Sequence, residues 1–444
     1  MSATYDLIVR GGECVLPEGV VRTDVGVRAG RIATLGDLGR ASAGEVVEAA
    51  GLTVLPGVID TQVHFREPGN EHKEDLETGA RAAVLGGVTA VFEMPNTDPP
   101  TTTAAALQDK LTRAKGRMWC DHAFYVGASP DNATKLGELE RLPGCSGVKV
   151  FMGSSTGTLL VPDDETLDAV MRSGTRRVSV HSEDEARLRE RKSIAEKSGD
   201  VHDHPNWRDA ETALHATVRL LRAARIYGRK VHVLHTTTAE EIRLLGQNRD
   251  IASVEVTPQH LTLVASDCYD RLGTFAQMNP PIREERHRAA LWQGIANGTV
   301  DVVGSDHAPH TREEKAKPYP VSPSGMPGVQ TLLPVLLDHV AAGRLDLRRL
   351  VELTSTGAAR LWGLRGKGAL AVGRDADLSI VDRKARRTIT NKWIASRCGW
   401  TPFDGMTVTG WPKATVIRGI VVMQDDEVRG QPVGQPLTFA ETAI

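Results

Sequence analysis

The chain has 444 residues, which is ample for a large core or for more than one domain. Its 54 Lys and Arg balance 56 Asp and Glu to a formal net charge of −2 without a basic block, which argues against a general nucleic-acid binder. With no run of about 18 apolar residues and no signal-peptide pattern at the start, we expect a cytoplasmic protein without a membrane span.

The first 50 residues carry a β pattern. Tyr5–Arg10 alternates between apolar and polar side chains until Gly11-Gly12 interrupts it. The pattern resumes over Asp24–Leu35, with a turn expected near Ala29-Gly30. These short segments predict a small sheet.

From about Thr53 onward, short β-branched apolar runs alternate with longer helical patterns. The predicted helices include Leu76–Gly86, Asp164–Ser173, Asp209–Tyr227 and Ala239–Gln247. Repeated strand–helix alternation predicts a parallel sheet, and its length of about 300 residues favours a closed (β/α)8 barrel of the TIM type. The predicted strands include Val88–Met94, His122–Val126, Val148–Met152, Arg177–His181, Lys230–His235, Ser253–Thr257 and Val300–Ser305.

Near Gly366 the β character returns. Asp375–Asp382, Thr388–Thr390 and Thr415–Gln424 have the composition of strands separated by turns. We therefore predict a discontinuous β-sandwich domain formed by residues 1–53 and 366–444, beside a barrel domain of residues 54–365. The tail from Gly430 is expected to run over the surface.

The cysteines predict free thiols. Their number is odd, and no two lie within a short metal-binding spacing, so neither a disulfide framework nor a cysteine zinc site is expected. The five residues are Cys14, Cys120, Cys145, Cys268 and Cys398.

Residues that can bind metals follow several of the predicted strands. In the segment after Val58, two-residue alternation places Asp60, Gln62 and His64 on one strand face. Lys149 lies within an apolar strand, and a histidine or aspartate ends three later strands. A barrel brings the carboxyl ends of its strands to one rim, so we expect these side chains to converge there. They are His64, Lys149, His181, His235 and Asp306.

This set of side chains suits a divalent metal. Imidazole and carboxylate are ligands that zinc prefers, and zinc lowers the pKa of bound water to about 7. Each residue alone also has an ordinary explanation, such as a hydrogen-bonded histidine, an edge lysine or a helix-capping Asp306. Their recurrence in order along the strands favours the metal site over these separate explanations.

The other histidines are expected to have structural roles. His232 should face away from His235, because an odd offset along a strand reverses the direction of the side chain. His122, His202, His204, His215 and His287 have no comparable context.

Several motifs together resemble the amidohydrolase superfamily and, within it, the dihydroorotases. They are the strand motif around His64, the tetrapeptide Met94–Thr97, the strand lysine, the two strand-end histidines and Gly304–His310. The late segment Gly368–Leu378 extends the resemblance over nearly the whole chain.

The resemblance implies one or two metals, usually zinc, and assigns roles to the candidate ligands. His64 would bind the more buried metal, and His181 and His235 the second. Lys149 would be carboxylated and would bridge the two. Asp306 would bind the first metal and act as the catalytic acid and base.

One position departs from the family pattern. The family has His-x-His after the first barrel strand, whereas this chain has Gln62-Val63-His64. A Gln amide oxygen is a weaker ligand than imidazole. Gln62 is therefore a doubtful ligand, and its metal position is predicted to be weaker, differently occupied or completed by water.

Four further residues indicate the substrate. Arg66 follows His64 by two and can grip a carboxylate with its planar fork, and Asn96 can donate to the same group. By resemblance, Asn279 would contact the substrate ring, His310 its carboxylate and the loop Pro323–Gly328 the ring through its backbone. The resemblance implies reversible hydrolysis of the cyclic amide of L-dihydroorotate to N-carbamoyl-L-aspartate, in pyrimidine biosynthesis.

Two alternatives stay open at this point. A hydantoinase or allantoinase would keep the metals and act on an uncharged ring, and Arg66 and Asn96 argue against it. A catalytically silent subunit that supports an aspartate transcarbamoylase would explain Gln62. A homo-oligomer, a dimer or tetramer, is also expected. Residues 156–158 and Pro280–Glu285 are both candidates for a loop that closes over the substrate.

Overall fold

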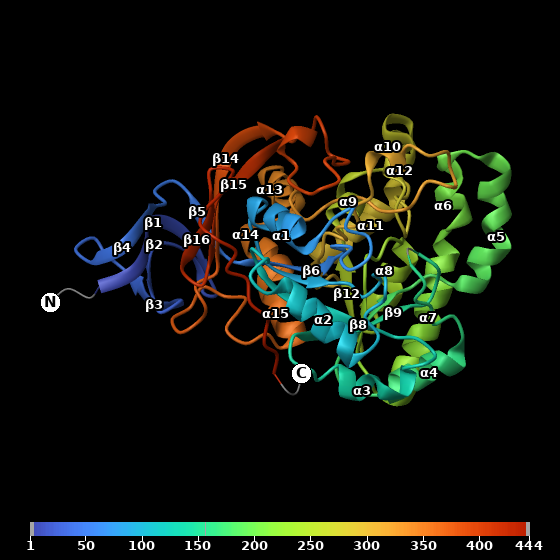
Figure 1. The fold of residues 1–444 in the computed structure, drawn as a ribbon. Coiled ribbons are helices and arrows are strands. Elements are labelled where there is room, and N and C mark those ends of the chain that lie inside the picture. The colour runs from blue at the N-terminus through green and yellow to red at the C-terminus, as the bar shows by residue number, and fades with distance from the viewer. Residues whose placement is uncertain (1–3, 156, 441–444) are drawn as a thin grey trace.

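The computed structural model describes residues 4–155 and 157–440 and contains two sheets. One is a parallel barrel surrounded by helices, and the other is a nine-stranded sheet built from both ends of the chain. In Figure 1 this second sheet lies to the left of the barrel, with its blue and red strands side by side. The predicted fold class, a barrel beside a smaller β unit from both termini, is confirmed.

Eight parallel strands form the barrel in sequence order. The pairing runs from β6 to β13, and a bridge between Val63 and His307 joins the last strand region to the first. Every strand residue is buried, as is usual when helices cover the outside of a parallel sheet. The strands are β6 (Val58–Val63), β7 (Val88–Glu93), β8 (Asp121–Gly127), β9 (Cys145–Phe151), β10 (Val178–His181), β11 (Val231–Val233), β12 (Ala252–Val256) and β13 (Val302–Val303).

The last barrel strand is much shorter than predicted. The apolar pattern predicts Val300–Ser305, but the ladder covers only Val302–Val303. Beyond it the backbone turns to bond across the rim, where the His64 N–H donates to the His307 carbonyl at 2.7 Å. This turn directs the following polar side chains towards the barrel mouth.

Most helices of the outer layer begin on an Asp or Thr side chain that caps the first turn. The four predicted helices are confirmed to within one residue at each end. The α-helices are α1 (Leu76–Leu85), α2 (Ala104–Ala114), α3 (Leu136–Leu139), α4 (Asp164–Arg172), α5 (Glu185–Ser198), α6 (His204–Trp207), α7 (Ala210–Tyr227), α8 (Ala239–Gly246), α9 (Pro258–Thr262), α10 (Ala265–Leu272), α11 (Glu285–Ala296), α12 (Arg312–Lys315), α13 (Leu332–Ala341), α14 (Leu347–Val351) and α15 (Gly357–Trp362).

Short helices of other types complete the layer. A π-helical turn, η4 (Glu352–Thr356), joins α14 to α15. The 3-10 turns are η1 (Ala133–Lys135), η2 (Val201–Asp203), η3 (Gly273–Ala276) and η5 (Asn391–Trp393).

The second sheet is continuous with the barrel through one strand. β5 pairs in parallel with β1 and antiparallel with β14, and after a single glycine the chain enters β6. Ser379 anchors this junction, because its hydroxyl accepts the Val58 N–H and donates to the Gly87 carbonyl. The strands are β1 (Thr4–Leu16), β2 (Gly19–Arg28), β3 (Arg31–Gly36), β4 (Ser42–Glu48), β5 (Thr53–Pro56), β14 (Leu378–Thr388), β15 (Thr407–Ile417), β16 (Ile420–Gln424) and β17 (Glu427–Val428).

The segment after β17 runs over the surface, as predicted, since Leu437 is the one buried residue of residues 430–440, and the segment is bonded to the barrel. The His122 N–H donates to the Gln435 carbonyl, and the Leu437 N–H donates back to the His122 carbonyl. Leu437 is buried in an apolar cluster with Phe92, Tyr125 and Trp362 inside the barrel. Val433 and Phe439 also pack against core clusters from the tail.

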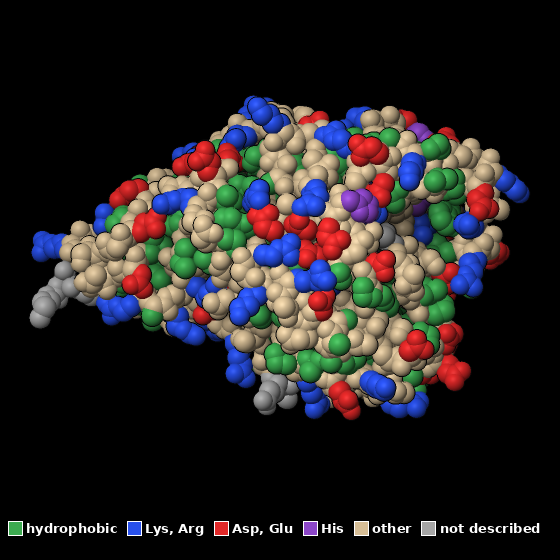
Figure 2. Space-filling view, viewed as in Figure 1, with side chains coloured by type: hydrophobic (Ala, Val, Ile, Leu, Met, Phe, Trp, Pro, Cys, Tyr) green, Lys and Arg blue, Asp and Glu red, His purple; other side chains and the backbone are tan. Residues whose placement is uncertain are grey.

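Other expectations from composition can be compared with the structure. All five cysteines are buried and unpaired, as predicted. Among the described helices, none is both long and apolar enough to cross a membrane. Figure 2 shows acidic and basic side chains interspersed over the visible face.

Candidate active site

The predicted site residues meet at the carboxyl end of the barrel. One small cavity is lined by all of them except His310, which contacts Arg66 from behind. The lining residues from the prediction are Gln62, His64, Arg66, Asn96, Lys149, His181, His235, Asn279 and Asp306. Barrel topology alone brings together positions that lie up to 244 residues apart in the chain.

Three of these residues have a left-handed backbone. The φ angles are 64° at Arg66, 35° at His235 and 44° at Asp306, and none of the three is glycine. Such conformations cost about 1–3 kcal/mol each and cluster at functional sites. Here they turn each side chain back over the barrel mouth directly after a strand.

On one side of the cavity, Asp306 accepts from two neighbours. The Gln62 Nε2 donates to Asp306 Oδ1 at 3.0 Å, and His64 Nε2 lies 3.2 Å from the same oxygen. Asn96 Oδ1 lies 2.8 Å from His64 Nδ1. Burial lowers the pKa of His64 to about 4, so the ring is neutral at pH 7 and has one proton for two acceptors. When Nδ1 donates to Asn96, the Nε2 lone pair faces the carboxylate, an arrangement that suits a cation.

On the other side, two imidazoles face each other. His181 Nδ1 and His235 Nε2 are 3.1 Å apart, and both rings are buried. Burial lowers the pKa of both rings, so they are neutral at pH 7. The second nitrogen of His235, Nδ1, has no hydrogen-bond partner among the described residues.

Lys149 is a buried amine without a hydrogen-bond partner. Its Nζ meets no acceptor among the residues described here and lies 4.4 Å from the centre of the Phe151 ring. Burial lowers the pKa of Lys149 from 10.5 to about 7, although Asp306 and Glu255 favour the charged form. A large share of this amine is therefore neutral and nucleophilic near pH 7.

These residues fit a metal only if Lys149 contributes a ligand. Among the described residues, no three His, Cys, Asp or Glu side chains are arranged to hold a metal ion. The donors instead form two pairs, His64 with Asp306 and His181 with His235. A carboxylated Lys149 would supply oxygen ligands to both pairs, and its unpartnered buried amine is consistent with that modification.

Arg66 is a buried cation without an acidic partner. Its side chain donates to the Pro309 carbonyl through Nε at 3.1 Å, and its Nη2 lies 3.3 Å from His310 Nε2. No ion pair joins Arg66 to an acidic side chain among the described residues, although the residue is only 3% exposed. Burial lowers its pKa to about 10, so it stays charged at pH 7. A buried guanidinium in the cavity wall, with carboxylates nearby but none in a direct ion pair among the described residues, is suited to an anionic ligand.

The sequence analysis missed three residues that hold the predicted ones. His204, interpreted as structural, places its Nε2 3.1 Å from Asn279 Oδ1. Glu183 and Arg208 form a buried ion pair behind His181. Only Glu183 had a signal in the sequence, since it follows His181 by two and thus lies at the same rim.

The cavity has room for little more than one water molecule. Its accessible volume is about 20 Å³, and a water needs at least about 10–15 Å³. It shares Ser155, Asn279 and Ser324 with a neighbouring cleft of about 520 Å³, which is therefore the route to the site.

The two candidate closing loops differ in their packing. Gly157 and Thr158 are exposed, while Thr156 lies outside the described residues. Residues 280–283 are buried, and Arg283 donates to Thr237 Oγ1 and to the Arg208 carbonyl.

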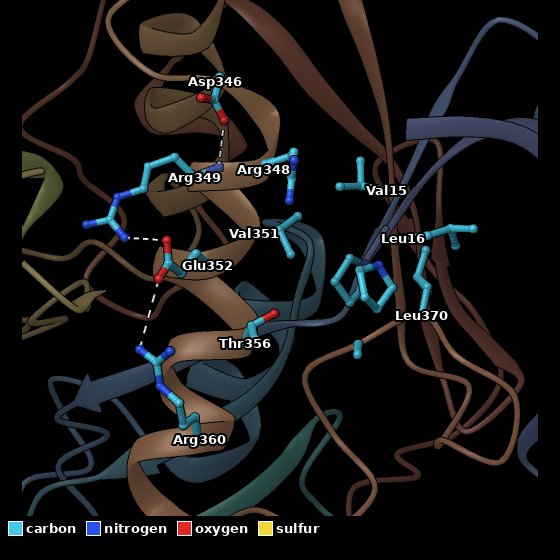
Figure 3. A pocket seen from close by; sticks show the side chains of 13 residues that line it. Val15, Leu16, Asp346, Arg348, Arg349, Val351, Glu352, Thr356, Arg360 and Leu370 are labelled. Atoms are coloured by element: carbon cyan, nitrogen blue, oxygen red, sulfur yellow. Dashed lines mark hydrogen bonds and ion pairs between the residues drawn. The ribbon is translucent and has the colours of Figure 1, made fainter. Parts of the chain in front are cut away.

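Another cleft lies away from the predicted site residues. About 580 Å³ opens between the α14–α15 helices and the β1 end of the second sheet, near Pro56 at the start of the barrel strands (Figure 3). There Arg349 and Arg360 both pair with Glu352 (Figure 3). None of the predicted site residues lines this cleft.

Comparison with known proteins identifies the family. The amidohydrolase family model matches residues 53–422, which include the barrel and all ten predicted site residues. The chain belongs to the amidohydrolase family. It is 38% identical to a dihydroorotase from Halobacterium salinarum, over 94% of this chain and 96% of that one. An Escherichia coli allantoinase is 32% identical, over 97% of both chains. Among solved structures, the L-hydantoinase of Arthrobacter aurescens superposes with a TM-score of 0.92 at 31% identity, covering 98% of this amidohydrolase and 100% of that chain.

Proposed function

We propose that this amidohydrolase is a dihydroorotase, which reversibly hydrolyses the ring amide of L-dihydroorotate to N-carbamoyl-L-aspartate in pyrimidine biosynthesis. Relatives named dihydroorotase, 34–38% identical over more than 90% of the chain, support this assignment. The allantoinase and hydantoinase relatives share the fold and match at 31–32% identity, so the substrate must be argued from the site.

The observation that carries the proposal is the buried guanidinium of Arg66. Dihydroorotate bears a carboxylate on its ring, whereas hydantoin and allantoin do not. A buried Arg66 without an acidic partner leaves a charge that a substrate carboxylate would neutralise. His310 and the Ser324 backbone lie beside it, since His310 Nε2 is 3.0 Å from the Ser324 carbonyl.

We further propose that zinc or another divalent metal is held by His64, His181, His235, Asp306 and a carboxylated Lys149. When bound, such a metal acidifies water and polarises the amide carbonyl. Gln62 is a weaker candidate, because an amide oxygen binds zinc less well than imidazole does. Its Nε2 donates to Asp306, while its Oε1 is buried without a hydrogen-bond partner among the described residues.

The residues of the chain account for the remaining steps. Arg66 and Asn96 hold the ring carboxylate and fix which carbonyl faces Asp306. Asp306 accepts a proton from the attacking water and returns it to the ring nitrogen that leaves. Burial of Asp306 keeps bulk water away from this transfer. Ring closure reverses these steps and consumes a proton, so lower pH favours it.

Ring opening of L-dihydroorotate, followed by ultraviolet absorbance, tests the proposal. The protein is purified with zinc and bicarbonate, hydantoin and allantoin are assayed in parallel, and Asp306→Ala serves as the blank. Turnover of dihydroorotate alone is expected. Turnover of an uncharged ring would instead indicate a hydantoinase or allantoinase, and no turnover by a metal-loaded protein would indicate a silent subunit.

The cellular setting is proposed from the sequence alone. A cytoplasmic location, a homodimer or homotetramer and an association with aspartate transcarbamoylase all remain predictions.

A further inference from the structure

We propose that Glu183 and Arg208 are positioning residues that fix the proton of His181 on Nε2 and so keep Nδ1 open for a divalent metal. The inference rests on the proposed function only in taking a metal to bind at His181 and His235. It goes further, because it assigns a role to two residues outside the predicted ligand set.

Glu183 determines which nitrogen of His181 carries the proton. Its Oε2 lies 2.9 Å from His181 Nε2, and both side chains are at most 1% exposed. An ionised carboxylate can only accept, so Nε2 must be the donor. A neutral His181 then has its lone pair on Nδ1, which faces His235 Nε2 at 3.1 Å. Hydrogen bonds of this kind commonly orient metal-binding histidines.

Arg208 holds the carboxylate in its ionised form and in place. Its Nε lies 3.2 Å and 3.1 Å from the two oxygens of Glu183, and its Nη2 lies 2.5 Å from Oε2. The same Nη2 donates to the Ser154 carbonyl at 2.8 Å. Arg208 therefore ties the end of the His181 strand to the loop that follows the Lys149 strand. Arg208 itself sits between α6 and α7, so three separate segments fix one imidazole.

His235 provides the contrast within the same pair. Its Nδ1 has no hydrogen-bond partner among the described residues, so nothing there selects one tautomer. Without metal, His235 can donate from Nε2 to His181 Nδ1; with metal, it must move that proton to Nδ1. The structure thus assigns a fixed ligand to His181 and an adjustable one to His235.

Glu183→Gln is the decisive variant. Its amide oxygen would pair with Arg208, which leaves an NH₂ group facing His181 Nε2. That group forces the His181 proton onto Nδ1 and blocks the metal-binding lone pair. Zinc affinity, measured by competition with a chromophoric chelator, is expected to fall about 10- to 100-fold.

Glu140→Gln is the matched control. Glu140 and Arg229 form another buried ion pair at 2.5 Å, with side chains 0% and 2% exposed, against 0% and 3% for Glu183 and Arg208. Thermal unfolding of both variants measures the loss of a buried pair as such. Zinc affinity of Glu140→Gln is expected to equal that of the unmodified chain. An equal loss of zinc affinity in both variants would show that the Glu183–Arg208 pair has only a structural role.

Two further readouts keep the inference testable if Glu183→Gln folds poorly. Long-range proton–nitrogen NMR of ¹⁵N-histidine-labelled, metal-free protein should show His181 protonated on Nε2, with the signal assigned through His181→Asn. Arg208→Lys keeps the charge but loses the fork, so a smaller loss of zinc affinity than in Glu183→Gln is expected. Protonation of His181 on Nδ1 in the unmodified chain, or unchanged affinity in both variants, would overturn the inference.

The readouts separate this inference from the proposed function. A chain that binds zinc with the expected tautomer but leaves dihydroorotate intact would refute the dihydroorotase assignment alone. A chain that hydrolyses dihydroorotate while Glu183→Gln keeps full zinc affinity would refute the positioning role alone.

Discussion

His64 with Asp306 and His181 with His235 form two halves of one site, and their surroundings differ. In the first half, Gln62 Nε2 and His64 Nε2 both lie within hydrogen-bond distance of one oxygen of Asp306. In the second half, the rings face each other, and only His181 has an acidic side chain behind it.

The different surroundings indicate that the two halves of the site have different tasks. Asp306 needs a defined orientation and a place to put a proton, and the hydrogen bonds from its neighbours supply the orientation. The second half instead places two neutral imidazoles against each other, which suits a pair of ligands for a cation. Changes in the first half should therefore act mainly on turnover, and changes in the second mainly on metal affinity.

The largest effect is expected for Asp306→Asn. Asparagine keeps the shape of the side chain but cannot take up a proton, and proton transfer of this kind contributes about 10²–10⁴-fold to rate. We expect kcat for dihydroorotate to fall by about that factor, measured by steady-state ring opening. Metal analysis of the same sample should still find zinc bound by the second half. A variant that keeps a tenth of the activity or more would contradict the role of Asp306.

The second-largest effect is expected when the charge of Arg66 is removed. Arg66→Gln leaves a substrate carboxylate without its buried partner, a loss of about 2–5 kcal/mol. We expect kcat/KM for dihydroorotate to fall about 10²–10³-fold, while any slow reaction with hydantoin is unchanged or improves. An equal loss for charged and uncharged rings would show that Arg66 supports the fold of the rim and does not select the substrate.

A smaller effect is expected for Gln62→His, which adds a metal ligand to the first half. The new imidazole replaces a side chain that now donates to Asp306. We expect zinc to bind about tenfold more tightly at this half, within the range known for single changes around metal sites. Metal equivalents after dialysis against a weak chelator, with Gln62→Leu as the control, measure the change. Loss of metal in Gln62→Leu alone would show that Gln62 is itself a ligand, and unchanged affinity in Gln62→His would contradict the prediction.

The smallest predicted effect is a pH dependence of Lys149 carboxylation. Burial lowers the pKa of Lys149 to about 7, and only the neutral amine reacts with CO₂. At constant dissolved CO₂, carbamate formation should rise about tenfold per pH unit below that value and level off above it. Carbon-13 NMR after addition of labelled bicarbonate and zinc follows the rate. A continued rise up to about pH 10 would place the amine at its ordinary pKa.

The sequence predicted well which segments form the barrel strands and which residues converge at their ends. Apolar runs located the barrel strands, and the position of Lys149, His181 and His235 at strand ends predicted their convergence. This success has a simple cause, since a parallel barrel places every strand end on one rim. Two strands were predicted too long, Lys230–His235 and Val300–Ser305, and the chain after the second bonds across the rim.

The backbone conformation of the site residues and the residues that hold them in place depend on contacts between distant segments. The left-handed backbone at Arg66, His235 and Asp306 has no clear signal in the sequence, because residues other than glycine adopt it only rarely. Arg208 reaches Glu183 from a separate helical segment, and His204 reaches Asn279 across 75 residues. Such partners follow from the packed fold, so local patterns could not identify them.

The shared strand path through β5 and β6 also has a consequence for synthesis of the chain. β5 pairs with Leu378–Val381 of β14, and Ser379 bonds to both Val58 and Gly87 next to the first barrel strands. On the ribosome, these early strands emerge more than 300 residues before their last partners, a separation evident from the numbering. The strand that carries Gln62 towards the site therefore reaches its final support only near the end of translation. A chain that terminates before β14 would lack that support at the start of its first barrel strand, even with every predicted site residue already made.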